Sequence, residues 1–235
     1  MSTIQNHPVP NYLLAALPSN DFERLLTKCE EVELFFSEVL YYSGEFISHI
    51  YFPIGSIISL VTSVDKDANL EMGLVGNEGM LGVTTILGIE NAPFQALVQG
   101  TGLALRIPVH SFLLELKQSA ALQQALNHYI YVLMRQLAQT AACNRFHVVE
   151  ARLARWLLMM QDRANSDHLN ITHVFLAYML GVRRVGITQA ANSLLNKNLI
   201  SYKRGAITIL DRVGLEAVSC SCYLADKEIY EHILG

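Results

Sequence analysis

The side chains best suited to chemistry form a group of polar and basic residues between positions 170 and 212. Arginine can donate two hydrogen bonds to guanine, and glutamine can make two with adenine. Lysine suits phosphate oxygens, and a small apolar side chain suits the methyl group of thymine. The segment therefore predicts contact with duplex DNA through Thr172, His173, Arg183, Arg184, Val185, Thr188, Gln189, Asn192, Lys203 and Arg204.

Two helices and a β-hairpin are predicted to position these side chains. Capping residues at 170–173 precede a run of apolar positions, and Gly181 ends that helix. A second helix opens at 182–184 and ends near Asn198, a left-handed cap. Residues 199–202 and 206–210 alternate like strands around a basic turn. This order predicts a winged helix-turn-helix.

The front of the second helix is the part of such a module that reads bases. Arg184 suits guanine or a phosphate, Gln189 suits adenine, and Val185 suits a thymine methyl. The remaining side chains divide into those that reach bases or backbone (Thr188, Asn192), those that hold phosphates at the wing (Lys203, Arg204) and those that anchor the first helix to the DNA backbone (Thr172, His173).

The same residues resemble a known family. The run "FLAYMLGVRR…AANSLLNKNLISYKRGAITILDRVGLEA" resembles the C-terminal domain of the Crp/Fnr transcription regulators. Upstream, "LLAALPSNDFERLL", "GEFISHIYFPIGSIISLV" and "NEGMLGV" resemble the sensor barrel of that family. The resemblance covers about residues 13–222 and implies a sensor barrel, a dimerisation helix and a DNA-binding domain.

The recognition segment departs from the family's pattern. Many members carry Ser-Arg-Glu-Thr-Val-Ser-Arg, in which Glu reads cytosine and the second Arg reads guanine. Here Arg184 matches the first Arg, but Val185 replaces Glu and Gln189 replaces the second Arg. We therefore do not expect an operator with the family's TGTGA-like or TTGAT-like half-site.

Charge divides the chain into two unlike parts. Residues 1–144 carry six Lys/Arg and thirteen Asp/Glu, whereas residues 145–235 carry eleven and eight. A basic module joined to an acidic one fits DNA binding. No apolar run reaches the length of a membrane helix, and residues 1–6 show no signal peptide. We expect a cytoplasmic protein that has no contact with membranes.

The first part is predicted to form an antiparallel β-barrel or jelly roll, which gives the chain an α+β fold. Nine of the fourteen glycines lie between Gly44 and Gly102, among short alternating segments. Short helices are expected at 12–17 and 21–28, and a further helix at 149–163. The predicted domains are a sensor at 1–115, a dimerisation helix at 116–147 and a DNA-binding domain at 148–235.

Homodimerisation is predicted through the central helix. Its seam has the 4-3 spacing of a heptad repeat over Leu122, Leu126, Tyr129, Leu133, Gln136, Thr140 and Cys143. The alternative is that this seam packs against the chain's own barrel. We expect the neighbouring stripe of Ile130, Met134 and Leu137 to make those internal contacts instead.

The sensor pocket has lost the residues that bind cyclic nucleotides in the resembling family. The Gly-Glu-Leu run that holds the ribose aligns with Gly82-Val83-Thr84, and the Arg-Ser pair that holds the phosphate falls in 91–96, where Gln95 and Ala96 lie and no Arg occurs. The base contact falls near the apolar Leu137. A buried phosphate needs a paired cation. We expect no cyclic nucleotide, and the effector is unknown.

No cofactor or metal is expected. Iron–sulfur clusters need four thiolates, and the sensor part has only Cys29 and Cys143. Cys220-Ser221-Cys222 alone is a weak metal or redox signal, so a structural role is favoured. The spacing of His49, His110, His128 and His147 indicates no haem ligand. The chain has no phosphate loop, nucleophile elbow or His-Glu-x-x-His motif, so no enzyme is expected.

The sequence thus predicts a homodimeric regulator of transcription on a palindromic operator. Its expected partners are duplex DNA, a second copy of the chain and RNA polymerase. One alternative is a constitutive regulator that needs no ligand. Another is a protein-interaction barrel that its DNA-binding domain only tethers.

Overall fold

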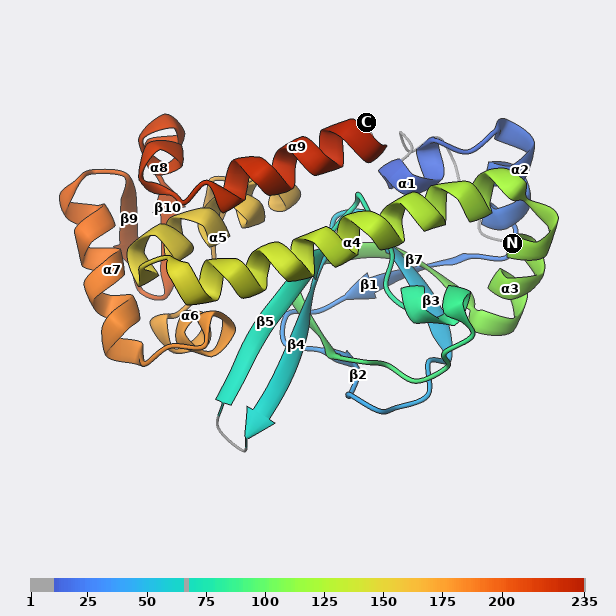
Figure 1. The fold of residues 1–235 in the computed structure, drawn as a ribbon, viewed down its shortest axis with the longest axis horizontal. Helices are drawn as coiled ribbons and strands as arrows, with labels where there is room; N and C mark the ends of the chain where they lie inside the picture. Colours follow the sequence, from blue (N-terminus) through green and yellow to red (C-terminus); the bar gives the residue numbers. More distant parts are fainter. Residues whose placement is uncertain (1–10, 66–67, 235) are drawn as a thin grey trace. The chain divides into compact units, whose positions relative to one another are not determined.

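The computed structural model describes residues 11–65 and 68–234. Residues 1–10, where the absence of a signal peptide is expected, lie outside this part. The chain divides into two compact units, one of residues 1–60 with 74–132 and the other of residues 61–73 with 133–233. The domain boundaries expected from the sequence remain a prediction. The long helix α4 (Ala120–Phe146) contributes to both units (Figure 1).

The first unit is built on two antiparallel sheets, with strand orders β1-β7-β3 and β2-β6-β4-β5. The strands are β1 (Glu30–Leu34), β2 (Val39–Tyr41), β3 (His49–Pro53), β4 (Ile57–Asp65), β5 (Ala68–Val75), β6 (Gln95–Gly100) and β7 (Gly102–Pro108). These confirm the predicted short strands and the α+β fold. Residues 61–65 of β4 and 68–73 of β5 belong to the second unit.

Short helices complete the first unit. They are α1 (Tyr12–Ala15), α2 (Ser19–Leu26), the 3₁₀ helix η1 (Val83–Leu87) and α3 (Val109–Gln118). Asn11, which is fully buried, caps α1 and donates hydrogen bonds of 2.9 Å to the carbonyls of Pro53 and Gly79. Gly102 allows β7 to begin beside Gly55, because a Cβ atom there would lie 2.4 Å from that residue's carbonyl carbon.

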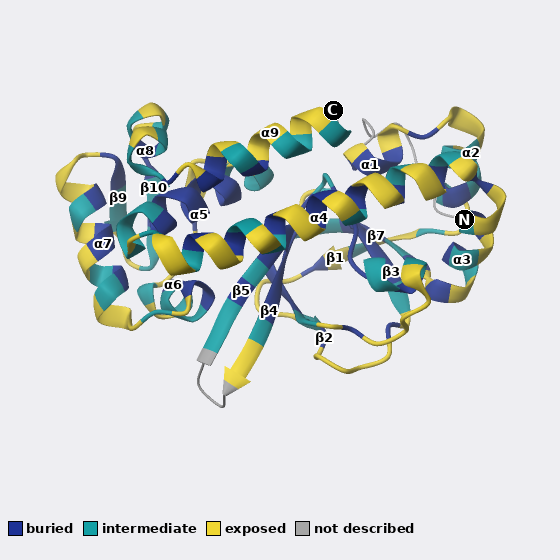
Figure 2. Ribbon diagram, in the orientation of Figure 1, coloured by how far each residue is buried: buried dark blue, intermediate teal, exposed yellow. Residues whose placement is uncertain are grey.

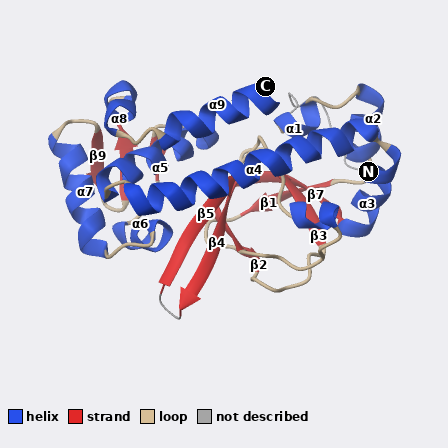
Figure 3. Ribbon diagram, viewed as in Figure 1, coloured by secondary structure: helices blue, strands red, loops and turns tan. Residues whose placement is uncertain are grey.

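The second unit is mostly helical (Figure 3). Besides part of α4 and these residues of β4 and β5 it contains α5 (Val149–Ala164), β8 (His168–Leu169), α6 (His173–Leu180), α7 (Arg184–Asn196), β9 (Ile200–Lys203), β10 (Ala206–Ile209), α8 (Arg212–Val218) and α9 (Cys222–Leu234). The three short strands form an antiparallel sheet in the order β8-β10-β9.

Helix α5 is the core of the second unit. Residues 152–160 are all buried, and the helix packs against α7 and α8. Trp156 donates a hydrogen bond of 2.9 Å from Nε1 to Glu71 on β5. Because α5 is buried on all sides over these residues, it is a close-packed support for the helices and the hairpin around it.

Candidate nucleic-acid interface

Helix α7 is positioned by the turn that precedes it. Thr172 caps α6 by accepting a hydrogen bond of 3.2 Å from the Phe175 amide, and Gly181 ends the helix with a φ of 60°. Both are as predicted, and the left-handed Asn198, with a φ of 57°, follows the end of α7 as predicted. The inner face of α7 has the spacing of an amphipathic helix, with Ile187, Ala190, Ala191 and Leu194 buried.

The outer face of α7 carries the predicted base readers. Arg184, Val185, Gln189 and Asn192 are exposed, as is the capping residue Arg183. Val185 is 59% exposed, so its side chain is accessible to a partner. The first turn of α7 also presents its free backbone amides, which favour a phosphate.

Two predicted contact residues are engaged inside the module. His173 Nδ1 lies 3.2 Å from the hydroxyl of Thr188, and that hydroxyl donates a bond of 3.1 Å to the Arg184 carbonyl. The His173 ring also stacks on Tyr202, with ring centroids 4.3 Å apart. Burial and the charge of Arg184 lower the pKa of His173, so its neutral form is favoured. These contacts indicate that His173 and Thr188 position α6, α7 and the wing relative to one another.

The wing is a two-residue hairpin. Lys203 pairs with Ala206, and the turn residues Arg204 and Gly205 have φ values of 48° and 84°, as a type I′ turn requires. Lys203 and Arg204 are exposed. The turn lies beside the cap of α6, since a Cβ atom on Gly205 would be 3.5 Å from Thr172 Cγ2. The wing tip and the start of α6 therefore share one surface.

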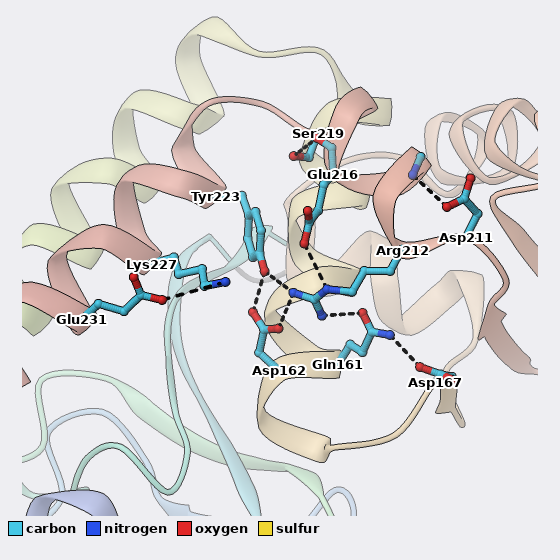
Figure 4. Close-up of polar contacts among 11 residues, drawn as sticks. Gln161, Asp162, Asp167, Asp211, Arg212, Glu216, Ser219, Tyr223, Lys227 and Glu231 are labelled. Carbon is cyan, nitrogen blue, oxygen red and sulfur yellow. Dashed lines mark hydrogen bonds and ion pairs between the residues drawn. The ribbon is translucent and has the colours of Figure 1, made fainter. Parts of the chain in front are cut away.

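Ion pairs decide which cations are free to bind a phosphate. Residues 168–212 contain six Lys/Arg. Lys197 pairs with Glu150 at 2.6 Å, and Arg212 lies 2.8 Å from Asp162 and 3.0 Å from Glu216 (Figure 4). The other four form no ion pair with any residue that the structure describes: Arg183, Arg184, Lys203 and Arg204. The unpaired charge is thus concentrated on α7 and the wing.

The predicted effector residues lie in both units. Gly82 and Ala96 are buried in the first unit, with Val83 opening η1 and Gln95 opening β6. A Cβ atom on Gly82 would meet the side chain of Ile50 at 2.6 Å, so the protein's own core closes this position. Thr84 Oγ1 is buried without a hydrogen-bond partner among the described residues. In the second unit, Leu137 lies beside Gly73.

The side chains of the seam predicted to mediate dimerisation are buried within the chain, so their role in dimerisation stays a prediction. Each of its seven side chains is at most 8% exposed: Leu122, Leu126, Tyr129, Leu133, Gln136, Thr140 and Cys143. Tyr129 packs beside Gly79 in the first unit, and Gln136 donates a bond of 3.0 Å to the Tyr230 hydroxyl in the second. Met134, expected to pack internally, is 62% exposed. The period of a helix identifies side chains that share a face, but not which chain covers that face.

Sequence reasoning missed a cluster of thiol and imidazole groups. Cys143 and His147, one helical turn apart, come together with Cys220 and Cys222 in the second unit. The hydrogen bond between Cys143 and Cys220 lowers the pKa of Cys143 and raises that of Cys220. The i, i+4 spacing of Cys143 and His147 was the available signal, but nothing in the sequence joined it to the distant Cys-x-Cys.

Comparison with known proteins agrees with the helix-turn-helix that the structure shows. Residues 151–218 match the model of the Crp-like helix-turn-helix domain. A comparison with curated proteins gave no match. Among the helices that the structure describes, none is long and apolar enough to cross a membrane.

Several solved structures share the fold. FixK2 from Bradyrhizobium japonicum is 12% identical with a TM-score of 0.70, over 82% of this chain and 98% of that one. A protein described as a Crp/Fnr-family regulator from Eubacterium rectale is 17% identical with a TM-score of 0.67, over 88% and 96%. The c-di-GMP responsive global regulator CLP of Xanthomonas campestris is 15% identical with a TM-score of 0.67, over 82% and 99%.

These matches confirm the family resemblance seen in the sequence, and none of them indicates an enzyme. At such identities the likeness between whole chains concerns the fold, whereas the match over residues 151–218 concerns the sequence itself. The chain therefore has the fold of the Crp/Fnr transcription regulators, and its residues 151–218 belong to the Crp-like helix-turn-helix domains.

Proposed function

We propose that the protein is a cytoplasmic transcription regulator that binds a palindromic operator as a homodimer. Helix α7 of each copy would enter a major groove, and the wing would contact the phosphate backbone. The observation that supports this proposal is the joint exposure of Arg184, Gln189 and Val185 on one face, flanked by cations that form no ion pair within the described part of the chain.

The operator follows from the side chains on that face. Arg184 suits guanine, Gln189 suits adenine and Val185 suits a thymine methyl. Thr188 contributes less to reading bases, because its hydroxyl already bonds to the Arg184 carbonyl and lies 3.2 Å from His173 Nδ1. We therefore expect a half-site in which one guanine, one adenine and one thymine dominate recognition.

A footprint on genomic DNA fragments tests the function. The wild type should protect two half-sites whose centres are about one helical turn, roughly 10 bp, or a multiple of it apart. At the lowest protein concentration at which the wild type protects fully, Gln189→Ala should protect only weakly, while Lys227→Ala, a change on the exposed face of α9, should protect fully. Binding that spreads evenly over all fragments, with no discrete footprint, would contradict a sequence-reading regulator and favour a merely tethered barrel.

The second copy is proposed to dock on the exposed face of α4. Tyr131 and Met134 are 50% and 62% exposed, and Ala138, Ala141 and Arg145 continue the same stripe with the 3-4 spacing of a heptad. The small side chains of Ala138 and Ala141, which are neighbours along this stripe, would allow two helices to approach closely. Figure 2 shows buried and exposed residues alternating along α4, so each face is distinct. A self-complementary stripe of this kind fits a two-fold dimer.

Sedimentation distinguishes this stripe from other surfaces. Met134→Glu would place two carboxylates opposite each other across the dimer, and we expect monomers. Val213→Glu makes the same change on α8 at a side chain that is 76% exposed, and it should leave the dimer intact. If Met134→Glu remains dimeric, the second copy does not dock here.

The barrel has a regulatory role in this proposal. We expect its effector not to be a cyclic nucleotide, since the 91–96 segment, where the resembling family holds the phosphate, has no arginine. The ligand would bias the dimer between two states that differ in the spacing of the two α7 helices.

A further inference from the structure

The cluster in the second unit has the composition and geometry of a metal site. The Sγ atoms of Cys143, Cys220 and Cys222 and a ring nitrogen of His147 all lie within 4.8 Å of one another. Cys143 stands in the last turn of α4 and His147 directly after it. Cys220 and Cys222 stand at the junction of α8 and α9. Three thiols and one imidazole thus converge from two distant parts of the chain.

The individual distances fit a tetrahedron around one ion. Zinc bonds of about 2.3 Å to sulfur and about 2.0–2.1 Å to nitrogen give tetrahedral edges of roughly 3.8 Å between two sulfurs and 3.5 Å between sulfur and nitrogen. Cys143 Sγ lies 3.4 Å from Cys220 Sγ, and Cys222 Sγ lies 3.4 Å from His147 Nδ1. In these two pairs the atoms need to move apart by only a few tenths of an ångström, and all six pairs lie within 4.8 Å, at most about 1 Å beyond the edge of such a tetrahedron.

The cluster is surrounded by buried positive charge, as expected for a site that carries negative charge. Arg152 and Arg155 are both buried beside it, and each has an Nε that lacks a hydrogen-bond partner among the described residues. Arg155 pairs with Asp226 at 2.5 Å, whereas Arg152 donates to the Leu180 carbonyl and has no carboxylate partner in the described chain. A buried cation without a counter-charge is costly. Three thiolates with one divalent cation carry a net charge of −1, which would supply that counter-charge.

A plain apolar role accounts poorly for the same residues. The three cysteines form a small buried cluster, and among the described residues Ala151 is the one partly buried hydrophobic side chain packed against it. Cys222 Sγ also accepts a hydrogen bond of 2.9 Å from Gln139 Nε2, the kind of outer contact that orients a ligand sulfur. All four cysteines of the chain are free, so no disulfide explains the convergence.

We propose that Cys143, His147, Cys220 and Cys222 form a closed Cys₃His site for a single zinc-like ion. Four protein ligands leave no open position, which is typical of structural rather than catalytic zinc. A multi-iron cluster would spread its ligands over several metals, whereas these four atoms lie close enough to share one. The site would fix the α4–α5 corner to the α8–α9 junction.

Metal titration of the full-length protein tests the site directly. Protein purified with a reductant, then stripped with a chelator, should bind one Zn²⁺ per chain and release protons as the thiols ionise. Co²⁺ should bind at the same stoichiometry and give the strong visible absorption of tetrahedral cobalt with thiolate ligands. Zn²⁺ should then displace Co²⁺ and bleach that absorption.

Variants locate the ligands. Cys220→Ala and His147→Gln should each weaken Zn²⁺ binding by more than about 100-fold, and Gln139→Leu by roughly 10–100-fold. Cys29→Ser removes the cysteine outside the cluster and should bind as the wild type does. His147 is only half-buried, so His147→Gln is expected to fold even if Cys220→Ala does not.

Two results would overturn the proposal. One is reduced wild-type protein that takes up less than half an equivalent of Zn²⁺ and gives no Co²⁺ absorption. The other is an equal loss of affinity in Cys29→Ser and in the cluster variants. In the first of these two cases, formation of a Cys143–Cys220 disulfide in air would assign the cluster to redox chemistry instead. None of these measurements depends on DNA binding.

Discussion

The salt dependence of DNA binding can be worked out from the ion pairs. Four cations per chain have no ion pair with a described residue, which makes eight in the proposed dimer: Arg183, Arg184, Lys203 and Arg204 in each copy. Each phosphate neutralised contributes about −0.9 to the slope of log K against log salt concentration. With Arg184 on guanine in each copy, six remain to contact phosphates, so the slope is about −5, and raising salt from about 50 to 200 mM weakens binding by about 10³-fold.

Two lysines provide a matched pair of perturbations. Lys203→Ala removes an unpaired cation from each copy, so the slope should become shallower by about 2 units in the dimer. Lys197→Ala makes the same change in net charge, but the Lys197 ammonium already lies 2.6 Å from the Glu150 carboxylate. Its removal should leave the slope unchanged.

Fluorescence anisotropy with a labelled duplex, measured at several salt concentrations, gives each slope. Equal slopes for the two variants would show that overall charge, not the placement of charge on the wing, governs binding. That result would refute the assignment of phosphate contacts from ion pairs, even if the protein binds DNA tightly.

Three further predictions concern recognition, pH and ligand choice. Gln189→Ala should weaken specific binding by roughly 1–3 kcal/mol and relax one base position, as measured with a set of operator variants, and equal loss on all sequences would contradict base reading. His173 has a lowered pKa, so its contribution to the free energy of unfolding is complete above about pH 6.5 and is lost as pH falls through the folded-state pKa. Urea unfolding should therefore depend less on pH in His173→Phe, which can still stack on Tyr202, and an unchanged pH dependence would show that His173 does not titrate in this way. Cyclic AMP and cyclic GMP should give no heat of binding in calorimetry, because no arginine occurs in the 91–96 segment, and micromolar binding would mean that another cation enters the pocket.

The DNA-binding module was predictable because its signals are local. Thr172, Gly181 and Asn198 each mark a helix end through their own backbone or side-chain preference, and the Arg204-Gly205 turn has the φ values that such a hairpin requires. The same holds for the alternating strands of the barrel. Local patterns therefore predicted the elements and their order.

The dimer face and the metal cluster depend on tertiary contacts, which local patterns do not encode. The seam from Leu122 to Cys143 does have heptad spacing, but other residues of the same chain bury its side chains. Tyr129, for example, packs beside Gly79. Cys143 and Cys220 are separated by 77 positions, and only the folded chain brings their sulfurs within 3.4 Å. Likewise, the sequence charge count could not distinguish the paired Lys197 from the unpaired Lys203.

The position of the proposed metal site along the chain has a mechanical consequence. The chain enters the helix-turn-helix module at the α4–α5 corner and leaves it at the α8–α9 junction, and these are the two places where the four ligands lie. An ion bound there would close the chain over the whole segment from Cys143 to Cys222, which includes α7 and the wing. Closing a long loop removes conformational entropy from the unfolded chain, and a metal that binds only the native state adds stability that grows with the logarithm of the free metal concentration over its Kd. The ion would then hold the helix-turn-helix module at the α4–α5 corner and the α8–α9 junction, away from the residues proposed to contact DNA. Arg184, Gln189 and the wing would remain free to contact a duplex.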